Sequence, residues 1–320
     1  MKPFICIISI LFVSSCTTPI SVKANSTELT SHQISTIAKS DWIHGSENCK
    51  TNQESTFDVY KHDEHSFIIR QNKCLTFEAP FSYILVGAQQ ILVIDTGALS
   101  DNPEFSLYAE LERIIGKNQL AVKKLLVVHS HSHSDHYQGD VYFNGRKNVE
   151  VVKTSASDVR SFFSFIDWPQ GQKTIDLGGR KIVVIPTPGH QEEAISVYDH
   201  HTKWLMTGDT LYPGYIYVKN WQAYKDSIDR LTHFTKNNAV TAIMGAHIEK
   251  QKSPNSYFPI GSTYQPNEAN LDLTVESLQI LNKELKHHNK PREIILDDFI
   301  IKPMSSLQKM LSNTARWFTQ

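Results

Sequence analysis

The chain has 320 residues, of which 40% are hydrophobic and 20% are charged, an ordinary globular composition with enough apolar material for a sizeable core. The formal net charge of −1 argues against nucleic acid, or an anionic membrane surface recognised by charge, as a partner. No internal repeat and no run of like charges is present.

The first 15 residues have the pattern of a secretory signal peptide. Lys2 precedes an apolar run over residues 4–13, which is too short to cross a bilayer as a helix. The stretch Val13-Ser14-Ser15-Cys16 resembles a bacterial lipobox, in which cleavage precedes the cysteine and its thiol receives lipid. An ordinary secretory signal with an incidental cysteine is the alternative. We therefore expect an exported bacterial lipoprotein, anchored to the membrane through Cys16 and, because Thr17 follows, held in the outer membrane facing the periplasm.

Residues 16–54 are expected to form the lipidated N-terminus and a tether. Residues 17 to about 41 are polar, without a sustained hydrophobic period, which is typical of a flexible linker. Cys49 and Cys74 remain once Cys16 is committed to lipid, and an even pair in an oxidising compartment favours a disulfide over two buried free thiols. Closing a loop of about 25 residues would stabilise the fold by about 3 kcal/mol in the chain-entropy model.

From residue 55 the sequence alternates short apolar strands with amphipathic helices, and one folded domain is expected over 55–320 with a helical extension from about 251. Sets of strands occur twice, which predicts two packed sheets with helices outside, a four-layer α/β arrangement. Strands are expected at 57–60, 67–70, 83–86, 91–94, 124–128, 181–185, 195–198, 204–206, 240–244 and 293–296, and helices at 102–117, 155–166, 221–234 and 271–287.

A cluster of metal-ligand side chains follows the expected strand at 124–128. Three histidines and an aspartate within six residues, on a loop at a strand end, can converge on a metal without long-range assembly. Histidine nitrogen and carboxylate oxygen together suit zinc, and iron or manganese less specifically. A surface turn is the weaker alternative at this spacing. The four residues are His131, His133, Asp135 and His136.

The segment His131-x-His133-x-Asp135-His136 resembles the HxHxDH signature of the metallo-β-lactamase superfamily. The other motifs of that family are present in order over roughly residues 57–250, which makes the resemblance specific. They contain Asp95 in Leu-Val-Ile-Asp-Thr-Gly, His190 in Pro-Thr-Pro-Gly-His, Asp209 in Thr-Gly-Asp-Thr and His247 in Met-Gly-Ala-His.

The resemblance implies a four-layer αββα sandwich with a dinuclear site, expected to hold two Zn²⁺. A metal-bound hydroxide would attack the substrate, with Asp135 and Asp209 as the catalytic carboxylates. Asp95 would lie behind the ligands and orient one histidine. The implied ligands are His131, His133 and His190 for the first metal, Asp135, His136 and His247 for the second, and Asp209 as the bridge.

Asp209 also indicates a branch of the family. Members that hydrolyse β-lactams typically carry Cys or Ser there, whereas glyoxalase II-like thioesterases, lactonases and phosphodiesterases carry Asp. We expect a small-molecule substrate with an ester, lactone or thioester carbonyl. β-Lactam hydrolysis is one alternative, and a mononuclear iron enzyme similar to sulfur dioxygenases is another. A non-catalytic binding protein is disfavoured by the intact ligand set.

Specificity is expected to come from aromatic side chains outside the motifs, although packing over the core is an equal alternative for them. His129 is expected to pack in the core rather than bind metal. The candidate lining residues of the substrate pocket are Trp168, Tyr212, Tyr257 and Tyr264.

Overall fold

The computed structural model describes residue 37, residue 39 and residues 41–99, 101–102 and 104–319, with side chains to residue 312. The predicted signal peptide and the lipidation site Cys16 lie outside these residues. Among the described residues, no helix combines the length and the hydropathy needed to span a bilayer.

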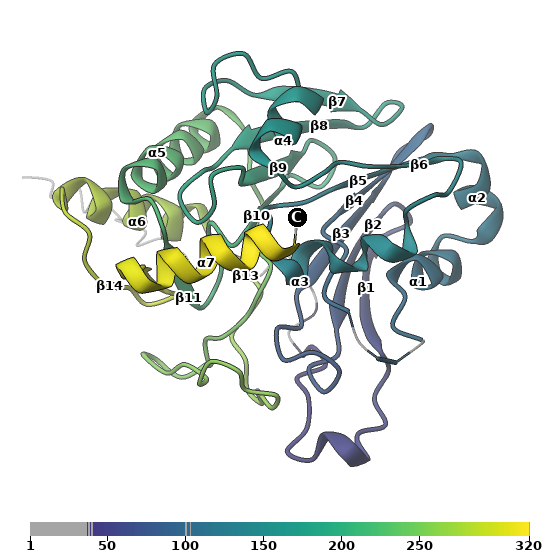
Figure 1. Cartoon of the computed structure of the whole chain (residues 1–320), viewed down its shortest axis with the longest axis horizontal. Coiled ribbons are helices and arrows are strands. Elements are labelled where there is room, and N and C mark those ends of the chain that lie inside the picture. Colours follow the sequence, from purple (N-terminus) through teal and green to yellow (C-terminus); the bar gives the residue numbers. More distant parts are fainter. Residues whose placement is uncertain (1–36, 38, 40, 100, 103, 320) are drawn as a thin grey trace, which may run out of the picture. The chain divides into compact units, whose positions relative to one another are not determined.

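The first sheet holds six strands in chain order, antiparallel from β1 to β4 and parallel from β4 to β6 (Figure 1). Its strands are β1 (Phe57–Asp63), β2 (Ser66–Gln71), β3 (Phe81–Val86), β4 (Gln90–Ile94), β5 (Lys124–Val128) and β6 (Val149–Val151).

The second sheet has the order β13-β12-β10-β9-β8-β7, in which β10 and β12 run parallel. A small third sheet joins β11, β15 and β14. The strands are β7 (Lys173–Asp176), β8 (Lys181–Pro186), β9 (Ile195–Asp199), β10 (Trp204–Gly208), β11 (Tyr215–Val218), β12 (Ala242–Gly245), β13 (Asp272–Leu273), β14 (Ile294–Ile295) and β15 (Ile300–Pro303).

Helices cover the outer faces of both large sheets. The α-helices are α1 (Leu107–Ile114), α2 (Lys117–Val122), α3 (Ser134–Tyr137), α4 (Ala156–Phe162), α5 (Trp221–Asn237), α6 (Val275–His287) and α7 (Ser306–Thr319), and the 3₁₀ helices are η1 (Cys49–Thr51) and η2 (Gln138–Tyr142).

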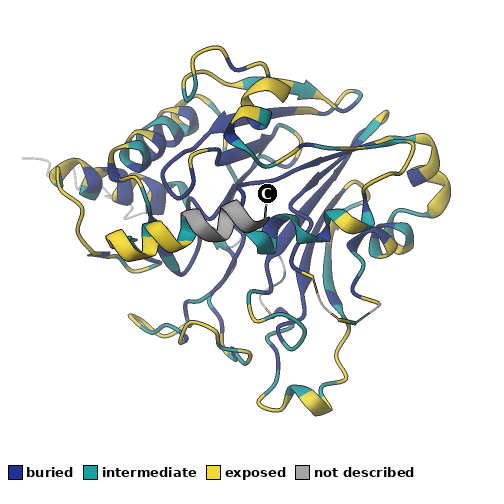
Figure 2. Cartoon of the chain, in the orientation of Figure 1, coloured by how far each residue is buried: buried dark blue, intermediate teal, exposed yellow. Residues whose placement is uncertain are grey.

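The alternation of side chains along each strand produces the layers. In β4, Leu92 belongs to the core between the two sheets, together with Val184 of β8. Its neighbour Val93 points the other way, into the core that includes Leu111 of α1. In β8, Val183 points away from the core between the sheets and belongs to a third core, which includes residues of α5 and α6. The inner strands β3, β4 and β8 are buried on both faces, and exposed residues concentrate on helices, loops and outer strands (Figure 2). The fold is therefore the predicted four-layer αββα sandwich.

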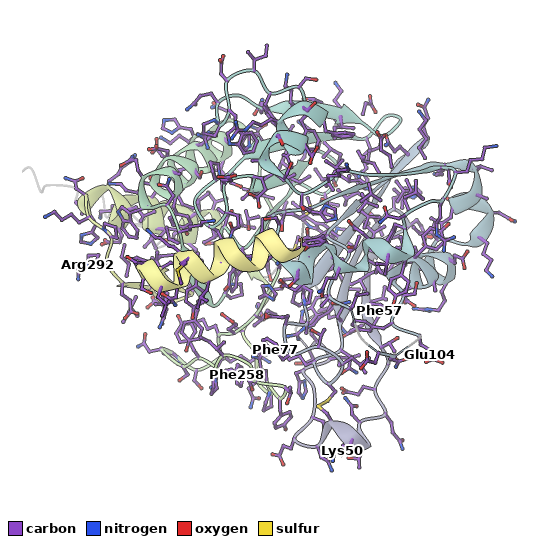
Figure 3. The ribbon with its side chains drawn as sticks, in the orientation of Figure 1. Lys50, Phe57, Phe77, Glu104, Phe258 and Arg292 are labelled. Atoms are coloured by element: carbon purple, nitrogen blue, oxygen red, sulfur yellow. A yellow bond between two sulfur atoms is a disulfide. The ribbon has the colours of Figure 1, made fainter. Side chains whose placement is uncertain are left out.

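The packed domain begins earlier than the predicted boundary at residue 55. Ile37 and Trp42 are buried in the core between the sheets. The Trp42 ring meets Phe81 of β3 edge-on at 4.8 Å between centroids, and the Ile43 amide donates to the Asp58 carboxylate at 2.8 Å. A disulfide joins Cys49 to Cys74, visible as a yellow bond near Lys50 in Figure 3. Part of the predicted tether is thus a structural part of the domain.

The packing of Trp42 predicts that its replacement lowers the stability of the fold, although it lies in a polar stretch without a hydrophobic period. We expect Trp42→Ala to lower the free energy of unfolding by about 3–5 kcal/mol, because it leaves a cavity between the sheets. Val122→Ala, at a position 82% exposed, is the control and should change it by no more than about 0.5 kcal/mol. Urea unfolding followed by tryptophan fluorescence and far-UV circular dichroism measures both. Equal stabilities would mean that Trp42 does not belong to the core of the fold.

The region after residue 251 is not a purely helical extension. β13 extends the second sheet beside β12, and β15 pairs in parallel with β11. The final helix α7, yellow in Figure 1, had no counterpart in the predicted elements.

Candidate metal centre

The predicted ligands come from one edge of the two sheets. β4 and β5 are parallel and end together, so Asp95 and the loop that carries His131 lie side by side, and the Asp95 amide donates to the Val128 carbonyl at 2.9 Å. β10 and β12 are also parallel, and Asp209 and His247 follow their ends. Carboxyl ends of parallel strands gather at a common edge, where loops can build a site.

The structure brings the seven predicted ligands together in two groups. Within each group, the candidate ligand atoms lie within 4.8 Å of one another. The first ligand group is His131, His133, His190 and Asp209, and the second ligand group is Asp135, His136 and His247.

Asp209 lies between the two groups with one carboxylate oxygen toward each. Oδ2 is 3.6 Å from His131 Nε2 and 3.5 Å from His190 Nε2. Oδ1 is 3.7 Å from His136 Nε2 and 3.5 Å from His247 Nε2. This is the placement that a bridging carboxylate requires.

Gly208 allows this placement because it precedes Asp209 with a φ of +52°. A Cβ atom there would lie 2.3 Å from the Ser130 Cβ, so any larger residue would push the carboxylate away from the loop that carries the histidines.

Burial and the state of the donors fit a metal ion. His136 Nε2 and Asp209 Oδ1 are buried and have no hydrogen-bond partner among the described residues, although buried polar atoms are normally paired. Burial, followed by the neighbouring histidines, holds the pKa of His131 and of His190 well below the usual range. Both rings are therefore neutral at pH 7 and have a free lone pair, the form that binds metal. Nitrogen and carboxylate donors in this number suit zinc, iron or manganese.

Asp95 stands behind the second ligand group, where it was expected. It accepts from the Ser130 amide at 2.6 Å, from the Ser130 hydroxyl at 2.8 Å and from His136 Nδ1 at 2.9 Å. These bonds hold it at a φ of +63°, a conformation unusual for a residue other than glycine. Because Asp95 fixes the hydrogen on Nδ1, His136 presents Nε2 to the centre.

Two backbone acceptors orient further histidines and were not predicted. His247 Nδ1 donates to the Glu78 carbonyl at 3.1 Å, and His190 Nδ1 donates to the Tyr217 carbonyl at 2.7 Å. Each leaves Nε2 bare toward the ligand groups. His129 was predicted to pack in the core rather than bind metal. It lies outside both groups, between the Val152 carbonyl and the Asp140 carboxylate.

A cavity of about 320 Å³ opens over the centre. Of the four predicted aromatic residues, Tyr212 lines it and the other three do not. Trp168 packs on Phe165, Tyr257 on Tyr215 and Tyr264 near His44. The lining that the sequence did not indicate consists of Glu78, Ser132, Ser134, Tyr217, Glu249, Ile260 and Met304.

A family model of the metallo-beta-lactamase superfamily matches residues 75–247, just over half of the chain. Acyl-coenzyme A thioesterase MBLAC2 from Bos taurus is 25% identical over 201 residues, covering 52% of this chain and 71% of that protein, and the Homo sapiens protein is 26% identical over the same extent.

Solved structures show a more distant likeness. A metallo-beta-lactamase from Pontibacter korlensis has a TM-score of 0.47 at 17% identity and covers 72% of this chain and 100% of its own. The DIM-1 metallo-beta-lactamase exposed to ceftazidime has a TM-score of 0.47 at 14% identity, with 74% and 99% covered.

The family match includes every motif from the Asp95 strand end to His247, and those motifs form a cluster suited to metal beneath a cavity. The chain belongs to the metallo-β-lactamase superfamily and is a hydrolase.

Proposed function

We propose that this protein is a dinuclear zinc hydrolase that cleaves a thioester, ester or lactone, with thioesters as the first class to test. The observation that carries the proposal is the position of Asp209, with one oxygen toward each ligand group. The acyl-coenzyme A thioesterase relatives support the choice of thioesters.

Two zinc ions would supply a water activated at neutral pH and a Lewis acid for the scissile carbonyl. The residues of the chain divide the other tasks. Asp95 and the carbonyls of Glu78 and Tyr217 fix His136, His247 and His190, respectively, so that each turns Nε2 toward the ligand groups. Asp135 and Asp209 would offset two of the four positive charges of two divalent ions, and the positive charge that remains would suit a developing negative charge.

The charge of the cavity separates the candidate substrates. Glu78 and Glu249 line it beside Asp135 and Asp209, and no lysine or arginine is among its described lining residues. Glu249 is held in place by the Tyr215 amide at 2.7 Å. A substrate with a carboxylate beside the scissile bond would meet these two acidic side chains, of which burial raises the pKa of Glu78 to about 7, and no lysine or arginine of the described lining. This favours uncharged acyl groups and argues against bicyclic β-lactams, which carry a carboxylate on the ring fused to the lactam.

The test is hydrolysis by the zinc-loaded protein of uncharged thioesters, lactones and esters, compared with β-lactams and phosphodiesters. We expect turnover with the first three classes and two zinc ions per chain by elemental analysis. Faster cleavage of β-lactams would overturn the substrate class. If the protein purified from its native source contained one iron ion per chain, the proposed function would change from a zinc hydrolase to an iron oxidoreductase.

We also propose that Cys16 carries a lipid that anchors the protein in the outer membrane facing the periplasm. The proposal rests on the ten-residue apolar run and the lipobox-like sequence. Cys16→Ser should move the protein from the membrane fraction to the soluble fraction, as measured by immunoblotting after ultracentrifugation. Cys6→Ser, inside the signal, is the matched control and should leave the protein with membranes. Equal sedimentation of Cys16→Ser and parent would refute the anchor.

A further inference from the structure

The side-chain amide of Gln191 lies directly behind His133 and is 1% exposed. Its nitrogen is 2.6 Å from His133 Nε2 and 3.0 Å from the Ser312 hydroxyl of α7. Its oxygen accepts from the Lys219 ammonium at 3.0 Å. The motif at His190 gave no sign of this network, although Gln191 is the next residue.

The donors and acceptors in this network have a direction. An ammonium group can only donate, so the amide oxygen must face Lys219 and the amide nitrogen must face His133. His133 Nε2 is therefore an acceptor. An imidazole ring that accepts a hydrogen bond at Nε2 has its one hydrogen on Nδ1. That nitrogen lies 3.0 Å from His190 Nε2, which is bare because His190 donates from Nδ1 to Tyr217.

A metal in the first ligand group requires the opposite tautomer. His133 Nδ1 lies 2.9 Å from His131 Nε2 and 3.0 Å from His190 Nε2, so Nδ1 is the atom that points to this group. With Nδ1 bound to metal, the hydrogen must be on Nε2, where it would face the amide nitrogen, another donor. If the amide turns over, its oxygen accepts from both His133 and the Ser312 hydroxyl, but its nitrogen then faces Lys219.

Lys219 has space to move away from the amide. It lines a separate cavity of about 410 Å³ together with Lys309 of α7 and the first turn of α5. An ammonium displaced from Gln191 therefore has an open volume beside it.

We propose that Lys219 and Gln191 form a tautomer lock on His133, which metal binding to the first ligand group must release. On release, the amide turns, Lys219 leaves it, and His133 loses the Nδ1 hydrogen and gains one on Nε2. His133 stays neutral throughout and contributes no net proton. Gln191 is a positioning residue, because it acts through His133. The inference rests on the metal site of the proposed function and is independent of the substrate.

Affinity for zinc tests the lock. A carboxylate can accept from His133 Nε2 and from Lys219 at once, so Gln191→Glu removes the conflict and should raise the affinity of the first zinc site about tenfold. Lys219→Met frees the amide to turn and should act in the same direction. Gln191→Leu leaves the Nε2 hydrogen buried without an acceptor and should lower the affinity about tenfold. Competition with a chromophoric chelator measures the stepwise affinities.

Ser312→Ala is the matched control, because a hydroxyl can donate or accept and so suits either amide orientation. It should leave zinc affinity within about threefold of the parent, the range of a single neutral hydrogen bond. If Gln191→Glu and Lys219→Met bind zinc no more tightly than the parent, the lock does not exist.

The tautomer itself provides a readout that needs neither substrate nor activity. After metal removal, the ring ¹⁵N chemical shifts of His133 should show the hydrogen on Nδ1 in the parent and on Nε2 in Gln191→Glu. A parent with the hydrogen on Nε2 would overturn the lock even if the enzyme hydrolyses thioesters. The expected tautomers in a protein that cleaves no thioester, ester or lactone would support the lock and refute the proposed substrates.

Discussion

Asp209→Ala is expected to reduce hydrolysis by about 10²–10³-fold or more, the cost of losing a group that organises charge at the reacting centre. The side chain removed is the one whose two oxygens face both ligand groups. Its loss takes a negative charge from both sites, but the first ligand group keeps three histidines. Metal should therefore be lost mainly from the second.

Metal-to-protein ratios by elemental analysis, measured together with turnover on the best thioester, test this expectation. Asp140→Ala is the matched control, since Asp140 pairs with His129 outside the ligand groups. It should bind two metal ions as the parent does. A fully active Asp209→Ala protein that still binds two metal ions would rule out the bridging role.

His190→Ala and His247→Ala should each remove a different metal. His190 belongs to the first ligand group and His247 to the second, and both are buried. Each variant should drop from two ions to one, with turnover lowered about 10²-fold or more because the remaining ion cannot position both water and carbonyl.

Cobalt substitution distinguishes the two variants. The ion that remains in His247→Ala would be bound by three histidines and Asp209. The ion that remains in His190→Ala would be bound by two histidines and the carboxylates of Asp135 and Asp209. Their visible absorption spectra should therefore differ. Identical spectra would mean that both variants keep the same ion and that the two groups form a single site.

The ligand set was predictable because each motif is short and follows a strand end. His131, His133, Asp135 and His136 lie within six residues, so a local pattern carries most of the second ligand group and half of the first. The period of the strands alone gave only the mixed α/β class. The two sets of strands suggested four layers, and the resemblance specified the αββα sandwich.

The features that could not be predicted from the sequence depend on contacts between residues far apart in the chain. The Glu78 carbonyl that orients His247 is 169 residues away, and a backbone acceptor has no residue type to recognise. Trp42 lies in a polar stretch without a period, so nothing marked it as core. Tyr257 and Tyr264 were expected in the pocket because they are aromatic and lie in a long loop, but such rings pack equally well on other rings, Tyr257 on Tyr215 and Tyr264 near His44.

The disulfide described above connects thiol chemistry to metal content. Cys74 begins the short segment that ends at Glu78, where the Lys73 ammonium also donates to the Phe77 carbonyl at 2.8 Å. That segment presents the carbonyl that fixes the tautomer of His247. We therefore expect maturation in a fixed order, with oxidation of the cysteines before stable loading of the second ion. Protein recovered from a reducing cytoplasm would then be under-metallated in a way that added zinc alone does not correct.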